Sequence, residues 1–147
     1  MIEFREIEGP PDAATLKKLK KIYESIFGTA KLDKFEERLA GAVNPLTVLA
    51  LDGQKIAGFK IGYELAPEKF YSWIGGVRKK FREQGIGAGL MKRQHDWCVK
   101  NGFQIVRTKT MNRFKSMLIL NIKNGFDIVE VYPDAQNELK IVLEKKL

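Results

Sequence analysis

The chain has 147 residues, of which 44% are hydrophobic, and its formal net charge is +8. This length predicts one domain, residues 1–147, with a core of its own, and the single cysteine, Cys98, excludes an internal disulfide. No stretch approaches the roughly 20 apolar residues of a membrane span, and the acidic start "MIEFREIEGPPD" lacks the apolar region of a signal peptide, so we expect a soluble, cytoplasmic protein.

The first part of the chain predicts a short strand followed by two helices. Ile2 and Phe4 alternate with polar residues as a strand does, and "GPP" interrupts that pattern. Apolar residues then recur at spacings of three and four from Pro11–Asp12 to Gly28, which indicates an amphipathic helix. The same spacing in "KLDKFEERLAGA", residues 31–42, predicts a second, shorter helix.

Three strands are expected next. The stretch "LTVLALDGQKIAGFKIGYEL", residues 46–65, contains two apolar runs separated by Asp52-Gly53, a pair typical of two-residue hairpin turns. The stretch "FYSWIGGV", residues 70–77, predicts a third strand. Its double glycine, Gly75-Gly76, indicates a bulge or a close approach to the backbone.

Helices and strands alternate in the second half of the chain. A helix begins near Gly85 and ends at "KNG", residues 100–102, with Cys98 on its buried face and His95 near its polar, exposed edge. A strand at 103–110, a helix at 113–125 and strands at 126–132 and 137–147 complete the chain. The order β-α-α-β-β-β-α-β-α-β-β predicts an α/β (α+β) domain with about seven strands and four helices around a mixed sheet.

The positive charge is concentrated in one segment. Residues 78–115 contain eleven Lys or Arg against two acidic residues, a local charge of +9, whereas the rest of the chain sums to −1. A charge excess confined to one segment favours a polyanionic partner there.

The stretch "VRKKFREQGIGAGLMKR", residues 77–93, predicts a phosphate site. A strand that ends near Val77 leads into a glycine-containing loop that opens a helix, so free backbone N–H groups and the helix dipole converge on one place. Gly85, Gly87 and Gly89 allow a diphosphate to approach the main chain, and the Arg82 guanidinium can donate a charge-assisted hydrogen bond to it.

The motif in this stretch is R-x-x-G-x-G, from Arg82 to Gly87, because the Walker pattern GxxxxGK[ST] is absent and GxGxxG fails at Leu90. With the element order above, the chain resembles the GNAT superfamily of acyl-CoA-dependent N-acyltransferases over essentially its whole length. The resemblance implies a single GNAT-like domain with a mixed, mostly antiparallel sheet. It also implies that acetyl-CoA is the acyl donor.

The resemblance implies where acetyl-CoA binds. Its pantetheine arm would lie where "YSWIGGV" splays from "FQIVRTK", and its pyrophosphate at the glycine motif. Lys79, Lys80, Lys115 and Arg113 remain alternatives for the 3′-phosphate. The cofactor-binding residues implied in this way are Gly75, Gly76, Val77, Arg82, Gln84, Gly85, Ile86, Gly87, Ala88, Asn112 and Lys115.

The resemblance also implies direct attack of a neutral primary amine on the thioester, with a backbone N–H near Val77 stabilising the oxyanion. Family members often protonate the departing thiolate with a tyrosine in "N-x-x-A-x-x-L-Y-x-K-x-G-F". In "NRFKSMLILNIKNGF", residues 112–126, Asn121 stands at that tyrosine. An amide is no general acid, so Asn121 is expected to hydrogen-bond the sulfur or the carbonyl. Further candidates are Tyr132, Tyr71 and Tyr63 as acid, and Glu64 and Glu68 as base.

Other interpretations stay open beside this one. The glycines can serve helix-to-strand packing, and a GNAT-like domain that binds acyl-CoA without turnover would explain Asn121. A nucleic-acid-binding module would use the same charge, but the aromatic residues stand at core-like positions, which disfavours it. No metal-ligand cluster accompanies His95. The acceptor, a small-molecule or peptide amine, would be shaped by residues 22–39 and the last hairpin, and a homodimer is typical of such domains.

Overall fold

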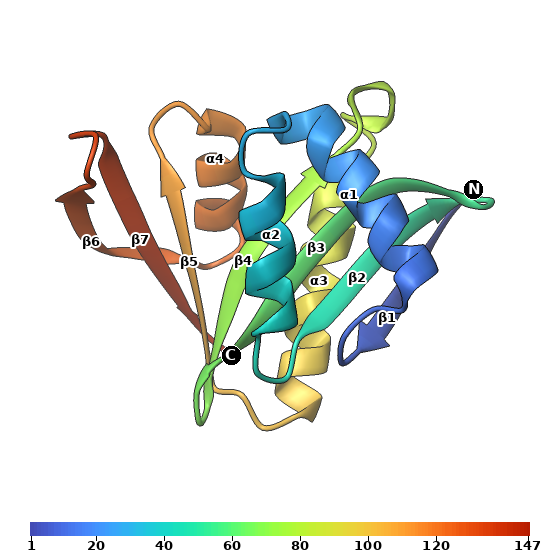
Figure 1. Ribbon diagram of the computed structural model, residues 1–147. Helices are drawn as coiled ribbons and strands as arrows, with labels where there is room; N and C mark the ends of the chain where they lie inside the picture. Colours follow the sequence, from blue (N-terminus) through green and yellow to red (C-terminus); the bar gives the residue numbers. More distant parts are fainter.

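The computed structural model describes residues 1–147 and contains one seven-stranded sheet with four α-helices (Figure 1). The strand order is β1-β2-β3-β4-β5-β7-β6, and only β4 and β5 pair in parallel. The elements are β1 (Ile2–Glu8), α1 (Ala13–Phe27), α2 (Leu32–Ala40), β2 (Leu46–Asp52), β3 (Lys55–Ala66), β4 (Lys69–Val77), the 3₁₀ turn η1 (Lys79–Phe81), α3 (Ile86–Lys100), β5 (Ile105–Met111), α4 (Lys115–Lys123), β6 (Asp127–Pro133) and β7 (Leu139–Lys146). The predicted class and element order are confirmed. None of the helices combines the length and the apolar character that crossing a membrane requires.

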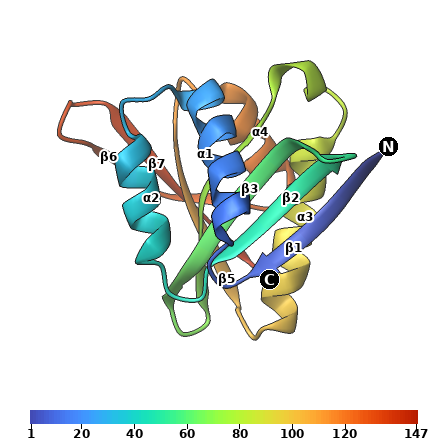
Figure 2. The ribbon, with the colours of Figure 1, turned by 45° about the vertical axis from the view of Figure 1, so that its right-hand side comes forward.

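Helices cover both faces of the sheet. Figures 1 and 2 show α1 and α2 on one face, with α3 and α4 on the other. Each face has its own apolar core: Leu19, Ile22, Phe35 and Phe59 are fully or almost fully buried under α1 and α2, while the second core joins α3 to the inward side chains of β2, β4 and β7. The sheet therefore separates two environments, which we call the α1/α2 face and the α3/α4 face.

The ends of α1 follow the predicted signals. The carboxylate of Asp12 accepts a hydrogen bond from the Thr15 N–H at 2.7 Å, which caps the first turn, and Gly28 ends the helix at φ 82°, a value that favours glycine.

Strand β1 is longer than expected, because β2 pairs with it from Ile2 to Glu8 although the alternation of the sequence weakens after Phe4. Pairing with a neighbour, rather than local pattern, sets the length of this edge strand.

The β2–β3 hairpin forms as predicted, but its turn is shifted by one residue. Asp52 pairs with Lys55, so the central residues are Gly53 and Gln54 rather than Asp52 and Gly53. Only Gly53 has a positive φ, 63°, as in a type II′ turn, which needs glycine at its first central position.

The double glycine of β4 is explained by contacts inside the protein. The register shifts between Ile61 opposite Ile74 and Gly62 opposite Ser72, so the bulged residue is Trp73 and not a glycine. A Cβ on Gly76 would lie 2.7 Å from Cδ1 of Ile26. The predicted close approach is real, and residues of this chain make it.

Strands β4 and β5 separate along their length. They pair only from Lys69–Ser72 on β4 and Ile105–Thr108 on β5, and from Trp73 to Val77 β4 has no partner on this side. Figure 1 shows the two strands diverging toward the edge where β4 ends and where α3 and α4 begin. The expected splay is confirmed, and it leaves a V-shaped break in the sheet.

Candidate functional site

The loop between β4 and α3 presents a row of unpaired amide donors. The backbone N–H groups of residues 83–88 donate to no acceptor within the chain, and the first bond of the helix runs from Gly89 N to Gly85 O at 3.0 Å. Glu83 and Gly85 have positive φ values of 64° and 77°, which turn successive N–H groups toward one side. Together with the dipole of the 15-residue helix α3, they form a cradle suited to a phosphate or diphosphate.

The three glycines of this stretch have different roles. Gly85 is required by its positive φ. A Cβ on Gly87 would meet only Cδ2 of Leu120 at 3.6 Å, an ordinary contact, so packing within the chain does not demand glycine there. A Cβ on Gly89 would collide with the Phe4 ring, so this glycine serves the packing of α3 on β1. The expectation that Gly89 faces a phosphate is wrong.

Arg82 links the two ends of the cradle loop. Its Nε donates to the Val77 carbonyl at 3.1 Å, and the side chain is exposed. The other guanidinium N–H groups make no bond within the chain and are available to an anion beside residues 84–88.

Three of the eleven cations in residues 78–115 form ion pairs with carboxylates from outside the segment. Arg107 pairs with Glu144 at 3.2 Å and with Glu130 at 3.6 Å, and Arg93 pairs with Glu6 at 3.6 Å. Arg113 pairs with Glu138 at 3.1 Å, which withdraws it from the set considered for the 3′-phosphate. Lys79, Lys80 and Lys115 form no ion pair. Ion pairs therefore interrupt the positive charge of the segment at three arginines and leave the lysines near the cradle loop free.

Helix α4 and the turn before it carry three predicted site residues, Asn112 and Lys115 for the cofactor and Asn121 for the thioester. Asn112 lies exposed in the turn after β5, and Lys115 is the first, exposed residue of α4. Asn121 is only 2% exposed; its carbonyl accepts from Phe126 N at 3.0 Å, and its side-chain amide makes no hydrogen bond. Its side-chain oxygen and nitrogen are not among the fully enclosed polar atoms, so they remain available to a bound molecule.

The remaining candidate catalytic residues lie elsewhere. Glu64 pairs in register with Phe70, at the opposite end of β4 from Val77, and accepts from Asn44 Nδ2 at 3.2 Å. The hydroxyl of Tyr132, on β6, accepts from Lys109 Nζ at 3.1 Å. The Tyr132 hydroxyl therefore meets the end of the Lys109 side chain across β7, which separates β6 from β5, and Glu64 lies at the far end of β4.

Lys60 is a functional candidate that the sequence patterns did not single out. It pairs in register with Gly75, and its Cγ lies 3.3 Å from the position of a Cβ on that glycine, so Gly75 leaves room for the lysine. The residue is 8% exposed, its ammonium forms no ion pair or hydrogen bond, and burial lowers the pKa of Lys60 to about 8. The signal in the sequence is a lysine between two glycines, Gly58 and Gly62, in an otherwise apolar strand.

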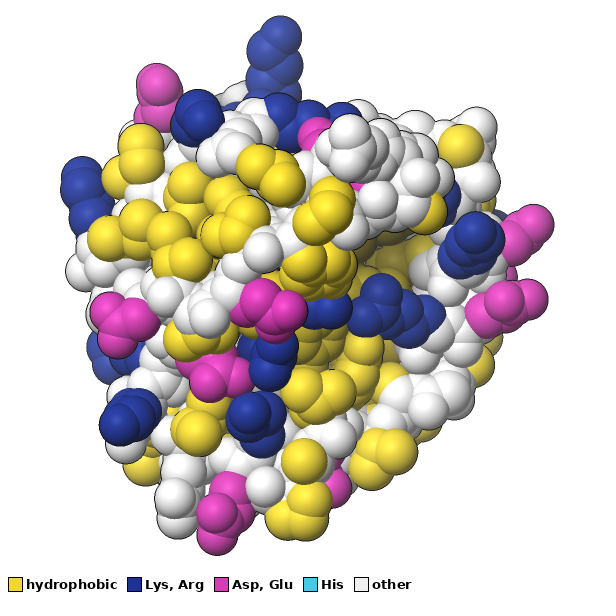
Figure 3. All heavy atoms as spheres, turned by 90° about the vertical axis from the view of Figure 1, so that its left-hand side faces the viewer, with side chains coloured by type: hydrophobic (Ala, Val, Ile, Leu, Met, Phe, Trp, Pro, Cys, Tyr) yellow, Lys and Arg dark blue, Asp and Glu magenta, His cyan; other side chains and the backbone are white.

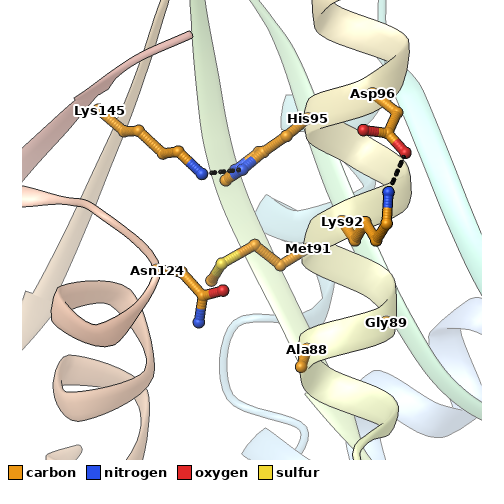
Figure 4. A pocket seen from close by; sticks show the side chains of 8 residues that line it. All are labelled: Ala88, Gly89, Met91, Lys92, His95, Asp96, Asn124 and Lys145. Atoms are coloured by element: carbon orange, nitrogen blue, oxygen red, sulfur yellow. Dashed lines mark hydrogen bonds and ion pairs between the residues drawn. The ribbon is translucent and has the colours of Figure 1, made fainter.

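A pocket of about 390 Å³ lies beside α3 (Figure 4) and contains His95. His95 is 6% exposed, so the expectation of an exposed histidine is wrong: the β7 and Phe126 segments cover that edge of the helix. Lys145 Nζ lies 3.3 Å from His95 Nδ1, which assigns the ring proton to Nε2, a buried atom without a partner. Burial, then the charges of Lys145 and Lys60, lower the pKa of His95 to about 3, so the ring is neutral and its free edge is enclosed.

We expect the free energy of unfolding to decrease by roughly 2 kcal/mol between pH 6.5 and pH 5 because of His95. Its pKa is about 3 in the folded protein and 6.5 in the unfolded chain, so the unfolded chain binds the proton first and stability falls as the pH falls. His95 is the only histidine. Urea titrations at both pH values test this, and His95→Gln should abolish most of the difference; an unchanged pH slope in that variant would contradict it.

A second group of side chains lies on the α1/α2 face, and we call it the arginine–aromatic cluster: Arg38 with Tyr63, Tyr71 and Trp73. The Arg38 guanidinium lies 4.9 Å from the Trp73 ring centroid and 5.6 Å from those of both tyrosines. Figure 3, which views the molecule from the side of β6 and β7, shows a hollow with a hydrophobic floor and Lys and Arg side chains at its edge. Residues 22–39, expected to shape an acceptor site, supply Arg38 of this cluster.

Cys98 is fully buried, and burial raises the pKa of its thiol to about 12, which makes it a poor nucleophile. The described residues contain no group of three His, Cys, Asp or Glu side chains that could hold a metal ion. The site therefore consists of the amide cradle, the gap between β4 and β5, and the arginine–aromatic cluster.

Comparisons with known proteins agree with this geometry. The model of the acetyltransferase (GNAT) family matches residues 14–117. Among solved structures, the ribosomal-protein-S18-alanine N-acetyltransferase from Escherichia coli is 16% identical over 97% of this chain and 94% of that chain, with a TM-score of 0.78. A putative GNAT acetyltransferase from Desulfovibrio desulfuricans is 14% identical, over 99% of both chains, with a TM-score of 0.83. NAA60 from Arabidopsis thaliana, in complex with acetyl-CoA, is 15% identical over 100% of this chain and 99% of that chain, with a TM-score of 0.80. No curated protein sequence matches the chain.

Proposed function

Because the chain belongs to the acetyltransferase (GNAT) family, we propose that it transfers an acetyl group from acetyl-CoA to a primary amine of a small molecule or peptide. The observation that carries this proposal is the cradle at residues 83–88, whose backbone N–H groups have no acceptor within the chain. A diphosphate fits this donor set because it supplies several acceptors and negative charge at a helix N-terminus. The neighbour from Arabidopsis thaliana was solved with acetyl-CoA, which supports the same donor here.

The cofactor contacts follow from this placement. The amides of Gln84, Gly85, Ile86, Gly87 and Ala88 bind the pyrophosphate, and Arg82 adds a charged hydrogen bond. The pantetheine arm follows the unpaired side of β4 at Gly75, Gly76 and Val77. One of Lys115, Lys79 and Lys80 binds the 3′-phosphate. Asn112, in the turn between β5 and α4, is a further candidate contact to the cofactor.

Acetyl-CoA supplies the thioester carbonyl that a neutral amine attacks, and the residues of this chain orient and stabilise the reactants. A backbone N–H near Val77 donates to the carbonyl oxygen, where negative charge develops. The Asn121 amide, which forms no hydrogen bond within the chain, hydrogen-bonds the sulfur or the carbonyl. Tyr132 is the candidate that protonates the thiolate, since Lys109 holds its hydroxyl beside β5. Glu64 stays a candidate base that would act through water, because it lies at the far end of β4.

The Arg82→Ala variant is expected to bind acetyl-CoA roughly tenfold more weakly, because one charge-assisted hydrogen bond is lost. Calorimetric titration measures this. Arg93→Ala is the matched control: Arg93 lies on α3, which begins after the cradle loop, and its guanidinium pairs with Glu6. Equal affinity of Arg82→Ala and wild type would contradict the assignment of the cradle.

Binding of acyl-CoA without turnover is the second candidate function, and Asn121 in place of the family's tyrosine favours it. Release of free thiol from acetyl-CoA over a panel of amines distinguishes the two functions. Thiol release that Gly87→Glu abolishes excludes the second candidate.

Two possible macromolecular partners are a nucleic acid and a second copy of the chain. A nucleic acid is disfavoured, because ion pairs with carboxylates divide the basic segment. A homodimer stays a prediction; the edge strand β6, with Ile128, Val129 and Val131 each at least half exposed, is the surface that supports it.

A further inference from the structure

Arg38 is held among aromatic rings without any acidic partner. Its Nε and Nη2 donate to the Tyr63 hydroxyl at 3.0 and 2.7 Å, and it forms no ion pair. A guanidinium has five N–H groups in a planar arrangement, so three remain free, while the two bonds to Tyr63 fix its orientation. Arg38 is therefore an oriented cation with unused donors.

Lys109 is a second cation beside the same cluster. Its Nζ bonds the Tyr132 hydroxyl at 3.1 Å and lies 5.5 Å from that ring, and it has no carboxylate partner. Tyr71 pairs in register with Arg107, and residues two apart on a strand point to the same side, so Lys109 lies on the same face of the sheet as Tyr71. Burial raises the pKa of Tyr71, while the charges of Arg38 and Lys109 both act to lower it. By contrast Arg107, two residues before Lys109 on the same strand, is neutralised by Glu144 and Glu130.

The two cations lie where the gap in the sheet begins. Tyr71 pairs with Arg107, and Lys109 follows Thr108, the last β5 residue that pairs with β4. A molecule bound at the arginine–aromatic cluster thus reaches the gap from the α1/α2 face. The cradle opens at the end of β4, where α3 begins, so donor and acceptor approach the gap from different places.

We propose that the acceptor is a primary amine that carries a carboxylate on an apolar, aromatic-sized body, with the carboxylate bound by Arg38 and Lys109 and the body by Tyr63, Tyr71 and Trp73. This inference rests on the proposed acetyl transfer and names the class of acceptor. Charge complementarity supports it, because Arg38 lies over the aromatic rings and Lys109 lies on the same face of the sheet, and neither forms an ion pair with a carboxylate. Polyamines and lysines of basic peptides are repelled by the same cations.

This arrangement also prepares the amine for attack. Nearby positive charges disfavour an ammonium ion and lower the pKa of the bound amine, so a larger neutral fraction is available to attack the thioester. The ammonium proton then leaves to solvent, and no carboxylate base has to contact the amine. A polycationic acceptor would keep further positive charges in the site and lose this advantage.

The test measures binding without the donor. Full-length protein is titrated with 3-phenylpropionate and with 3-phenylpropanamide, which share the ring and differ in the carboxylate, and binding is followed by calorimetry at low salt. We expect the carboxylate to bind at least fivefold more tightly, and Arg38→Gln and Lys109→Gln each to reduce the difference. Arg93→Gln is the control, because Arg93 also lies over a ring, that of Phe4 at 5.5 Å, on the other side of the sheet.

A second arm follows thiol release from acetyl-CoA with L-phenylalanine, L-phenylalaninamide and spermidine. Faster release with L-phenylalanine supports the proposal; equal or faster release with the amide or with spermidine overturns it. Binding of neither probe, or equal binding of both, overturns it as well. If acetyl-CoA itself does not bind, the proposed function fails, whereas the preference for the carboxylate probe still decides the nature of this surface.

Discussion

Gly87→Glu is expected to abolish acetyl-CoA binding, with a loss of roughly 100-fold or more in affinity, while the fold stays intact. Gly87 is the second residue of α3, and its amide is one of the unpaired donors of the cradle. A carboxylate there occupies the anion site and repels the pyrophosphate. The fold tolerates the change, because a Cβ at Gly87 meets only Leu120, at 3.6 Å.

The stability of this variant separates a lost site from a lost fold. Glutamate in the first turn gains helix propensity and interacts favourably with the helix dipole, so the free energy of unfolding should rise by roughly 0.5–1 kcal/mol. Gly87→Gln has nearly the same size without the charge and should retain more affinity than Gly87→Glu. Calorimetry and urea denaturation measure the two quantities. Affinity of Gly87→Glu within threefold of wild type would refute the cradle.

Lys60→Met is expected to raise the free energy of unfolding by roughly 3 kcal/mol at pH 7. Burial lowers the pKa of Lys60 from 10.5 to about 8, so below pH 8 the folded protein holds an ammonium without a partner. Between pH 8 and 10.5 the unfolded chain binds the proton and the folded one does not, so wild-type stability rises with pH. The advantage of methionine should therefore shrink over that interval.

Lys55→Met is the matched control for Lys60→Met. Lys55 lies on the same strand but is exposed at its start, and its replacement should change stability by less than about 0.5 kcal/mol. Urea denaturation at pH 7 and pH 10 provides both comparisons. A loss of stability in Lys60→Met at pH 7 would show that the ammonium has a stabilising partner. Reduced affinity for acetyl-CoA in a more stable Lys60→Met protein would place Lys60 at the donor site.

Lys60 and Asn121 are two residues at which cofactor binding and the stability of the free domain are expected to be linked. Both residues are at most 8% exposed, and neither side chain forms a hydrogen bond within the chain. For Lys60, burial also disfavours the charged form and so costs stability in a free domain. A bound pantetheine arm with its amides and thioester would supply partners in this region. This is the reason to measure affinity and stability together in each variant.

Local sequence patterns predicted most of the helices and strands and, of the site, the amide cradle. The helix from Asp12 to Gly28 needs only a cap, an apolar spacing and a glycine with positive φ, and all three are visible in the sequence. The motif from Arg82 to Gly87 is likewise contiguous, so its loop conformation and its free N–H groups follow from neighbouring residues. The expected turn at Asp52-Gly53 was off by one residue because strand register, set by packing across the sheet, decides which residues face each other.

The sequence by itself determined the element order, the single domain and the cradle, because these depend on periodicity and on backbone conformations that a few adjacent residues impose. The tertiary structure alone decided which glycine serves the cradle and which serves packing, since Gly87 meets only Leu120 whereas Gly89 lies against Phe4 from the other end of the chain. It also decided which charges remain free. Arg107 meets Glu144 and Arg38 meets only aromatic rings because the order of the strands, which no local pattern encodes, selects the neighbours of each side chain.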